Sequence, residues 1–215
     1  MMKTKKKYLV LIIYCLCFYA IWTVFELHIK SNISSQIIKT VIVKNAVWTL
    51  PAVLLVHIFR DSVQIKLKEM FVTKVKWWRY LWVYALLAAW VLLGGLFQSG
   101  GLSFVIDPDA MIVVLFVGIT EEMVFRGWLL NATVKDMPQW LAILLNAAMF
   151  LAIHFPRWVQ EDIFISTFVS FNFIGLVILS AIFSIAFLRS KNILIPITMH
   201  MLYDLLMFVL LPQVS

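Results

Sequence analysis

The stretch AMIVVLFVGITEEMVFRGWLL, residues 110–130, combines an apolar run of membrane-spanning length with three charged side chains. A transmembrane helix needs about 20 predominantly apolar residues, and this stretch has that length. Each charge near the bilayer centre costs about 3 kcal/mol even on lenient scales, so charges are tolerated where they face a partner or a wet cavity. We therefore interpret this stretch as a membrane helix in which Glu121, Glu122 and Arg126 mark a functional site.

The composition extends this interpretation to the whole chain. Of its 215 residues, 63% are hydrophobic and 13% are charged, and the mean hydropathy is +0.97. This is too apolar for an ordinary soluble domain, so an all-α, polytopic membrane protein is expected. Stretches that approach the length of a membrane span predict about seven transmembrane helices. They are residues 8–25, 38–59, 77–97, 110–131, 138–155, 163–188 and 193–211.

No linker, internal repeat or low-complexity stretch divides the chain, which predicts a single integral membrane domain over residues 1–215. The second stretch is the weakest span, because Lys39 and Lys44 lie in its first half; an amphipathic entry segment is the alternative there. The first stretch begins like a signal peptide, but it is long enough to span and no small-residue cleavage site follows. We expect it to be a retained helix.

The basic residues predict the orientation in the cell membrane. The formal net charge is +7, but Lys and Arg lie mostly in short loops between spans, where topology requires them, so no nucleic-acid partner is expected. With a cytoplasmic amino terminus, thirteen Lys and Arg fall on the inner side and four, Lys30, Lys39, Lys44 and Arg157, on the outer side. Seven spans would then leave Ser215 outside.

Of the two glutamates in the fourth span, only one is spaced to form an ion pair with Arg126 along the helix. Glu122 and Arg126 are four residues apart and share a helix face, with the acid before the base, which is the favourable order for a helical ion pair. Glu121 is rotated by about 100° from Glu122 and is left without that partner. One carboxylate is therefore expected to be neutralised locally, while the other remains available for chemistry. Helix-to-helix adhesion is an equally ordinary role for the ion pair itself.

Two later spans carry histidines. The fifth ends NAAMFLAIHF, with Phe150 and His154 on one face, and the seventh contains PITMHMLYDLL, with His200 and Asp204 four residues apart. Histidine and aspartate at this spacing can hydrogen-bond, or can present polar groups jointly to a cavity. With Glu121 they predict an acid/base or metal-ligand set between helices four, five and seven.

These three motifs, all within residues 118–204, resemble those of a known family. The pattern EExxxR, then FxxxH, then HxxxN or HxxxD, on successive transmembrane helices, is that of the CAAX-protease and bacteriocin-processing (CPBP or Abi) family of intramembrane endopeptidases. Here the pattern is present as Glu121-Glu122 with Arg126, Phe150 with His154, and His200 with Asp204. The first 105 residues carry no such signature.

The resemblance implies hydrolysis of a peptide bond in a peptide or a membrane-anchored protein within the lipid bilayer. It implies Glu121 as general base, His154 as the residue that positions the attacking water, and His200 and Asp204 as the groups that hold the oxyanion. Glu122, paired with Arg126, would support Glu121. A bacterial peptide, in bacteriocin immunity or peptide-signal processing, is expected as substrate rather than a prenylated protein.

Asp204 departs from the form of the motif that ends in Asn. An amide can donate a hydrogen bond to an oxyanion, whereas an ionised carboxylate can only accept one. Asp204 is therefore expected to be protonated, to orient His200, or to bind a metal. A metal-free glutamate mechanism is favoured; the alternative is a zinc ion held by His154, His200 and Glu121, which would be an ordinary ligand set with one open position.

Two other functions remain open at this stage. The polar residues could join helices in a non-catalytic membrane partner or regulator, or could form part of a small transporter, since intramembrane Glu and His also mark ion pathways.

The positions of the two histidines along their helices add a further condition for a shared site. At about 1.5 Å per residue, His154 lies roughly 24 Å, and His200 roughly 10 Å, from the inner ends of their spans. Helix tilt or a break near Pro156 must therefore bring the two histidines together.

Overall fold

The computed structural model describes residues 2–33, 35, 38–97 and 101–211, and over these residues it is helical without strands. The all-α prediction is therefore confirmed. The first half contains α1 (Met2–Val24), η1 (Phe25–Ile29), η2 (Lys30–Asn32), η3 (Ile38–Thr49), α2 (Leu50–Ile58), α3 (Leu67–Val72), η4 (Trp77–Tyr80) and α4 (Leu81–Phe97). The second half contains α5 (Pro108–Glu122), η5 (Met123–Leu130), α6 (Asn131–Thr133), α7 (Gln139–Ala152), α8 (Phe155–Gln160), α9 (Phe164–Val169), α10 (Phe173–Ser190) and α11 (Leu194–Leu210).

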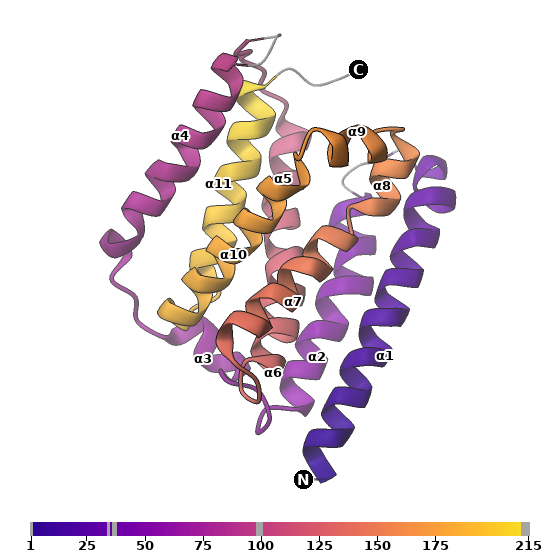
Figure 1. The fold of residues 1–215 in the computed structure, drawn as a ribbon, viewed down its shortest axis with the longest axis vertical. Helices are drawn as coiled ribbons and strands as arrows, with labels where there is room; N and C mark the ends of the chain where they lie inside the picture. Colours follow the sequence, from indigo (N-terminus) through magenta and orange to yellow (C-terminus); the bar gives the residue numbers. More distant parts are fainter. Residues whose placement is uncertain (1, 34, 36–37, 98–100, 212–215) are drawn as a thin grey trace.

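The long helices lie side by side in one bundle (Figure 1). α4 packs on α11, α11 packs on α5, and α5 packs on η3, while α2 packs on η5. α10 contacts both α7 and α11, and α8 contacts η1. The amino-terminal helices thus pack directly on the segment that carries the three motifs. α1 begins at one end of the bundle and α11 ends at the other (Figure 1).

The chain is a multi-pass membrane protein. By length and composition, five of the described helices are long and apolar enough to cross a membrane: Lys6–Asn32, Val41–Ile58, Trp77–Phe97, Gln139–Gln160 and Phe173–Ser190. The helical run formed by α5, η5 and α6 carries the three charges of the opening stretch, and α11 is a shorter apolar helix. The count of seven spans therefore stays a prediction.

One expected span is divided in the structure, and the weakest one is helical over nearly its whole expected range. The stretch 163–188 was predicted to be one helix, but it is divided into α9 and α10, and Phe171 between them has a φ of 59°. That backbone region is unfavourable for a residue with a side chain and does not continue a right-handed helix. The weak second stretch is helical from Ile38 to Ile58, as η3 and then α2, and it includes a candidate span.

Local hydrogen bonds define where the two site-bearing helices begin. Asp107 caps α5, because its carboxylate accepts a hydrogen bond of 3.0 Å from the backbone N–H of Asp109, and Pro108 occupies the first helical position. Before α11, the Asn192 side chain accepts a bond of 2.8 Å from the Leu194 N–H and donates one of 2.8 Å to the Thr73 carbonyl. These bonds fix the start of the helix that carries His200.

A glycine lets α5 approach α11 closely. A Cβ at Gly118 would lie 2.9 Å from Cγ of Met201 and 3.3 Å from the carbonyl oxygen of Ile197. A larger side chain would push the two helices apart, and overpacking of this kind costs about 1–3 kcal/mol.

We therefore expect Gly118→Val to lower the melting temperature of the purified protein. Gly94→Val is the matched control, because no atom outside its own helix lies within 4 Å of that Cβ position. Equal melting temperatures for the two variants would show that the close approach at Gly118 contributes nothing.

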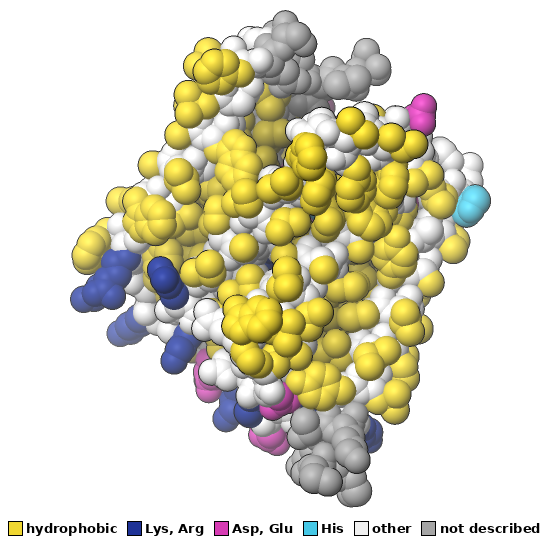
Figure 2. Space-filling view, viewed as in Figure 1, with side chains coloured by type: hydrophobic (Ala, Val, Ile, Leu, Met, Phe, Trp, Pro, Cys, Tyr) yellow, Lys and Arg dark blue, Asp and Glu magenta, His cyan; other side chains and the backbone are white. Residues whose placement is uncertain are grey.

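Charged side chains are unevenly distributed over the surface. Figure 2 shows Lys and Arg gathered at the end of the molecule where α1 begins, close to α3 and the start of α4, with hydrophobic side chains over most of the rest of this face. This pattern agrees with the sequence-based division of basic residues. The carboxyl-terminal position Ser215 lies outside the described residues.

Candidate active site

Glu121 and Glu122 end α5 and are followed immediately by the π-helix η5, Met123–Leu130. A π-helical turn is rare and is found frequently at functional sites, because it alters the phase of the side chains around the helix. Both carboxylates are buried, Glu122 completely and Glu121 to 6% exposure. Two adjacent acids in the interior require cationic or hydrogen-bonding partners.

The partners of Glu122 form a fully buried network. Its Oε1 accepts a hydrogen bond of 2.8 Å from Nη1 of Arg126, as the sequence spacing predicted. Nη2 of Arg126 donates to the Ser180 carbonyl at 3.0 Å and to the Ser180 hydroxyl at 2.9 Å. The guanidinium also lies over the Phe150 ring, 4.8 Å from its centroid. Arg126 thus joins α10 and α7 to the helical run of α5 and η5 that carries Glu121 and Glu122.

His200 lies among three carboxylates. Its Nδ1 is 2.8 Å from Oε1 of Glu122, while its Nε2 is 3.4 Å from Oδ2 of Asp204 and 3.9 Å from Oε2 of Glu121. The sequence predicted the His200–Asp204 contact but not the one with Glu122. A carboxylate at one ring nitrogen fixes the orientation of the ring and leaves the other nitrogen facing the site.

His154 lies at a break in the helix, between the end of α7 and the start of α8. Its Nδ1 is 2.8 Å from the carbonyl oxygen of Phe150. A carbonyl only accepts hydrogen bonds, so Nδ1 is the donor, and Nε2 of the neutral ring is left as an acceptor.

The two histidines meet across one aromatic ring. The Phe150 ring centroid is 5.3 Å from that of His154 and 6.1 Å from that of His200. Straight parallel helices would not allow this. The sequence alone, with straight spans, would separate His154 and His200 along the bundle. The helix ends at Ala152 and α7 is inclined relative to α11 (Figure 1), so the two histidines lie closer together than that.

Lys44 completes the set, at a place in the site that the sequence pattern did not predict. Its Nζ lies 3.2 Å from Oε1 of Glu121, and its side chain is 14% exposed. Glu121 lacks Arg126 as its partner, as expected, but it has a cationic partner from another helix. Lys44 was expected in the second span and was counted with the basic residues of the outer side; its ammonium lies within the bundle. The available signal was a lysine inside an apolar helical stretch, VIVKNAVW, where a charge is a functional candidate by default.

The ligand set suggested for zinc was His154, His200 and Glu121. Across the parts of the chain that the structure describes, no group of three or more His, Cys, Asp or Glu side chains has an arrangement that could hold a metal ion. One ring nitrogen of each histidine is already engaged, His154 with a carbonyl and His200 with Glu122. Lys44 further places an ammonium group at the Glu121 carboxylate.

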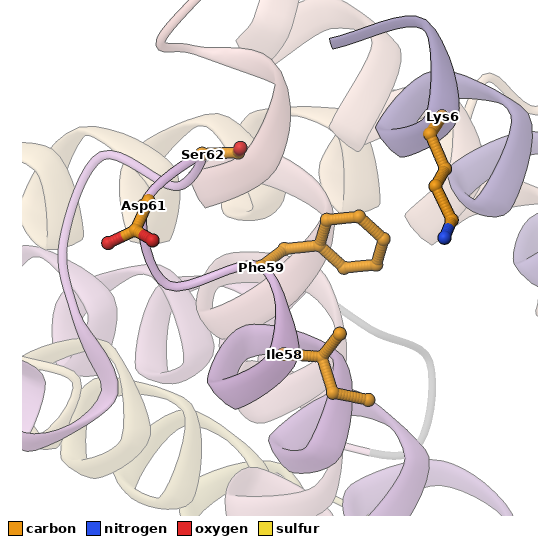
Figure 3. Close-up of a pocket in the computed structure, with 5 residues that line it drawn as sticks. All are labelled: Lys6, Ile58, Phe59, Asp61 and Ser62. Carbon is orange, nitrogen blue, oxygen red and sulfur yellow. The ribbon is translucent and has the colours of Figure 1, made fainter. Parts of the chain in front are cut away.

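Two hollows lie away from these polar residues. One, of about 210 Å³, lies between α1 and the chain after α2. In Figure 3 the Phe59 ring of its wall projects toward the side of Lys6. A second cavity, of about 450 Å³, is apolar and lies between the end of α1 and η3, with Trp22 and Trp48 in its wall. Neither is lined by a residue of the three motifs.

The comparison with protein families covers the same segment as the polar site. Residues 103–206 match the family model described as type II CAAX prenyl endopeptidase Rce1-like. This segment, just under half of the chain, is similar to the Rce1-like family. The Rce1-like segment runs from the approach to α5 into α11 and contains Glu121, His154, His200 and Asp204. No curated protein and no solved structure matches the chain.

An Rce1-like endopeptidase segment in a multi-pass membrane protein supports an intramembrane protease function. The match begins at residue 103, so α1 to α4 and η3 lie outside it. Lys44 is therefore a contribution to the site from a part of the chain that the family comparison does not reach.

Proposed function

We propose that this protein hydrolyses a peptide bond in a peptide or membrane-anchored protein substrate, with Glu121 as general base. The observation that carries the proposal is the convergence on His200: within the Rce1-like segment, its Nε2 is 3.9 Å from Glu121 and 3.4 Å from Asp204. A protein that only binds a partner would need its buried charges to be paired for stability. It would not need His200 with Nε2 close to two carboxylates and His154 with Nε2 left as a hydrogen-bond acceptor.

The proposed reaction begins with a water between Glu121 and His154. The Glu121 carboxylate takes a proton from this water, whose oxygen attacks the carbonyl carbon of the scissile bond. Nε2 of His154 is free to accept a second hydrogen bond from the same water, because Nδ1 is engaged by the Phe150 carbonyl. Glu121 then returns the proton to the leaving amine as the C–N bond breaks.

Charge that develops on the carbonyl oxygen needs a donor, and His200 is the proposed one. Nδ1 donates its hydrogen to Glu122, so Nε2 also carries a hydrogen when the ring is protonated, and this imidazolium form is the proposed donor to the oxyanion. Asp204, close to Nε2, is proposed to orient the ring and not to bind the oxyanion itself, since an ionised carboxylate cannot donate. We therefore propose an orienting role for Asp204, where the sequence departs from the Asn form of the motif.

The mechanism is proposed to depend on glutamate and not on a metal ion. The support comes from Lys44, because an ammonium 3.2 Å from Glu121 repels a divalent cation at the same carboxylate. A peptide signal or bacteriocin-related peptide remains the proposed substrate class. The gathering of Lys and Arg near α3 and the start of α4, at the same end of the molecule as the start of α1, supports a cytoplasmic amino terminus in the cell membrane.

The test uses purified protein in lipid vesicles with a pool of internally quenched peptides, half of them farnesylated on a cysteine. We expect the parent protein to release fluorescent fragments, with cleavage sites read by mass spectrometry, and we expect His154→Ala and His200→Ala to lose most of this activity. Metal content is measured on the same samples. Zinc at one atom per chain that disappears with either histidine would replace the glutamate mechanism by a metal mechanism, and a parent that cleaves nothing would contradict hydrolysis.

A further inference from the structure

Lys44 has an unusual position for a lysine in a membrane helix. A long cationic side chain in a span ordinarily extends along the helix to place its head group in the polar interface. Lys44 instead directs its Nζ into the bundle, where it lies 3.2 Å from Glu121 and 14% of the side chain is exposed. Keeping the ammonium there costs free energy unless the surroundings compensate.

The surroundings of Lys44 are built to hold a cation. Its Nζ lies 4.8 Å from the ring centroid of Trp48 and 5.1 Å from that of Trp22, close enough for cation–π attraction to both rings. The two rings meet edge to face with centroids 4.5 Å apart, and both are buried. Lys44 itself lies in the π-helix η3, a second rare helical segment next to the site.

The ion pair with Lys44 gives the two carboxylate oxygens of Glu121 different neighbours. Oε1 contacts Lys44, while Oε2 is the oxygen nearer to His200. A carboxylate held at one oxygen cannot rotate freely, so the lone pairs of the other oxygen keep one direction relative to the histidine. A general base works only when it is within hydrogen-bond reach of the proton that it removes, in the right orientation.

We propose that Lys44 is a positioning residue for Glu121: it holds Oε1 and keeps the carboxylate ionised and directed toward the attacking water. The amino-terminal part of the chain thereby completes an active site whose motifs lie entirely within the Rce1-like segment. This inference rests on the proposed hydrolysis, with Glu121 as base.

Three variants test the role by kinetics on the most rapidly cleaved peptide of the quenched pool. Lys44→Met removes the charge and keeps most of the length, Lys44→Arg keeps the charge, and Lys39→Met removes a half-buried lysine of the same helix for which no ion pair is seen among the described residues. We expect Lys44→Met to lower kcat by about tenfold to a hundredfold, as a misplaced catalytic group does, with a smaller change in KM. Lys44→Arg should restore most of kcat, and Lys39→Met should resemble the parent.

A second measurement needs no substrate. Dicyclohexylcarbodiimide modifies carboxylic acids in their protonated form, and a buried carboxylate that loses its ionic partner takes up a proton. We expect Lys44→Met to increase modification at Glu121 several-fold over the parent, located by mass spectrometry, with Lys44→Arg close to the parent and Glu121→Gln as the blank. The folded fraction of each variant is measured by size exclusion and melting.

The outcomes separate this inference from the proposed function. A parent that cleaves no peptide overturns the proposed function, and with it the positioning role in hydrolysis, while the carbodiimide result still decides whether Lys44 holds the Glu121 charge. A parent that cleaves while Lys44→Met has the same kcat and the same modification overturns the Lys44 inference alone. A loss of kcat that follows only the folded fraction, without rescue by arginine, also overturns it and makes Lys44 structural.

Discussion

Glu121→Gln is expected to lose at least about a hundredfold in peptide cleavage, the lower end of what a positioned general base contributes, while the protein stays folded and inserted. Glutamine has nearly the size of glutamate, and its carbonyl oxygen can still accept a hydrogen bond from Lys44 at the position of Oε1. What it lacks is the ability to take a proton from water. Cleavage of the quenched pool, normalised to folded protein, measures the loss.

The matched control is Glu161→Gln. Glu161 also forms an ion pair, with Arg157 at 2.7 Å, but its side chain is 40% exposed and lies outside the polar site. This variant should cleave at the rate of the parent. If Glu121→Gln retains more than a tenth of the parental rate, Glu121 is not the base, and either a histidine is the base or a metal-bound hydroxide is the nucleophile.

Arg126→Ala is expected to remove folded protein as well as activity. The guanidinium is completely buried, bonds Glu122 and two oxygens of Ser180, and lies between the rings of Phe150 and Phe183. Truncation leaves the Glu122 carboxylate without its cation, and breaking a buried pair in this way costs about 3–5 kcal/mol. Yield after detergent extraction and the melting temperature measure the effect.

Two further variants separate charge from packing. Arg157→Ala removes an arginine from an exposed pair and should change stability by about 0–1 kcal/mol. The double variant Arg126→Met with Glu122→Gln removes both charges, so it should regain part of the stability lost in Arg126→Ala. Its cleavage rate should remain low, because His200 loses the carboxylate at Nδ1. Unchanged melting of Arg126→Ala with complete loss of cleavage would place Arg126 in the chemistry instead.

The sequence by itself determined the class of fold, the membrane setting and the motif residues. Length and apolar composition require helices in a bilayer, because an apolar segment can satisfy its own backbone hydrogen bonds there only as a helix or in a closed barrel. The i and i+4 spacing of Glu122 and Arg126 required nothing beyond helix geometry, and their ion pair is present as predicted. The three motifs in order also predicted the family whose model matches residues 103–206.

The tertiary structure decided which side chains from different helices meet. The spacing of residues along one helix does not predict a contact with a residue more than seventy positions away. The contacts of Lys44 with Glu121 and of His200 with Glu122 could therefore not be predicted from the sequence pattern. Both depend on how α5 packs against η3 and α11, and the approach to α11 depends on the missing side chain at Gly118. The approach of His200 on α11 to the Phe150 ring on α7 is likewise a property of the packed bundle. Local sequence thus fixed the helices and the charges that need partners, while long-range packing in a low-dielectric interior selected those partners.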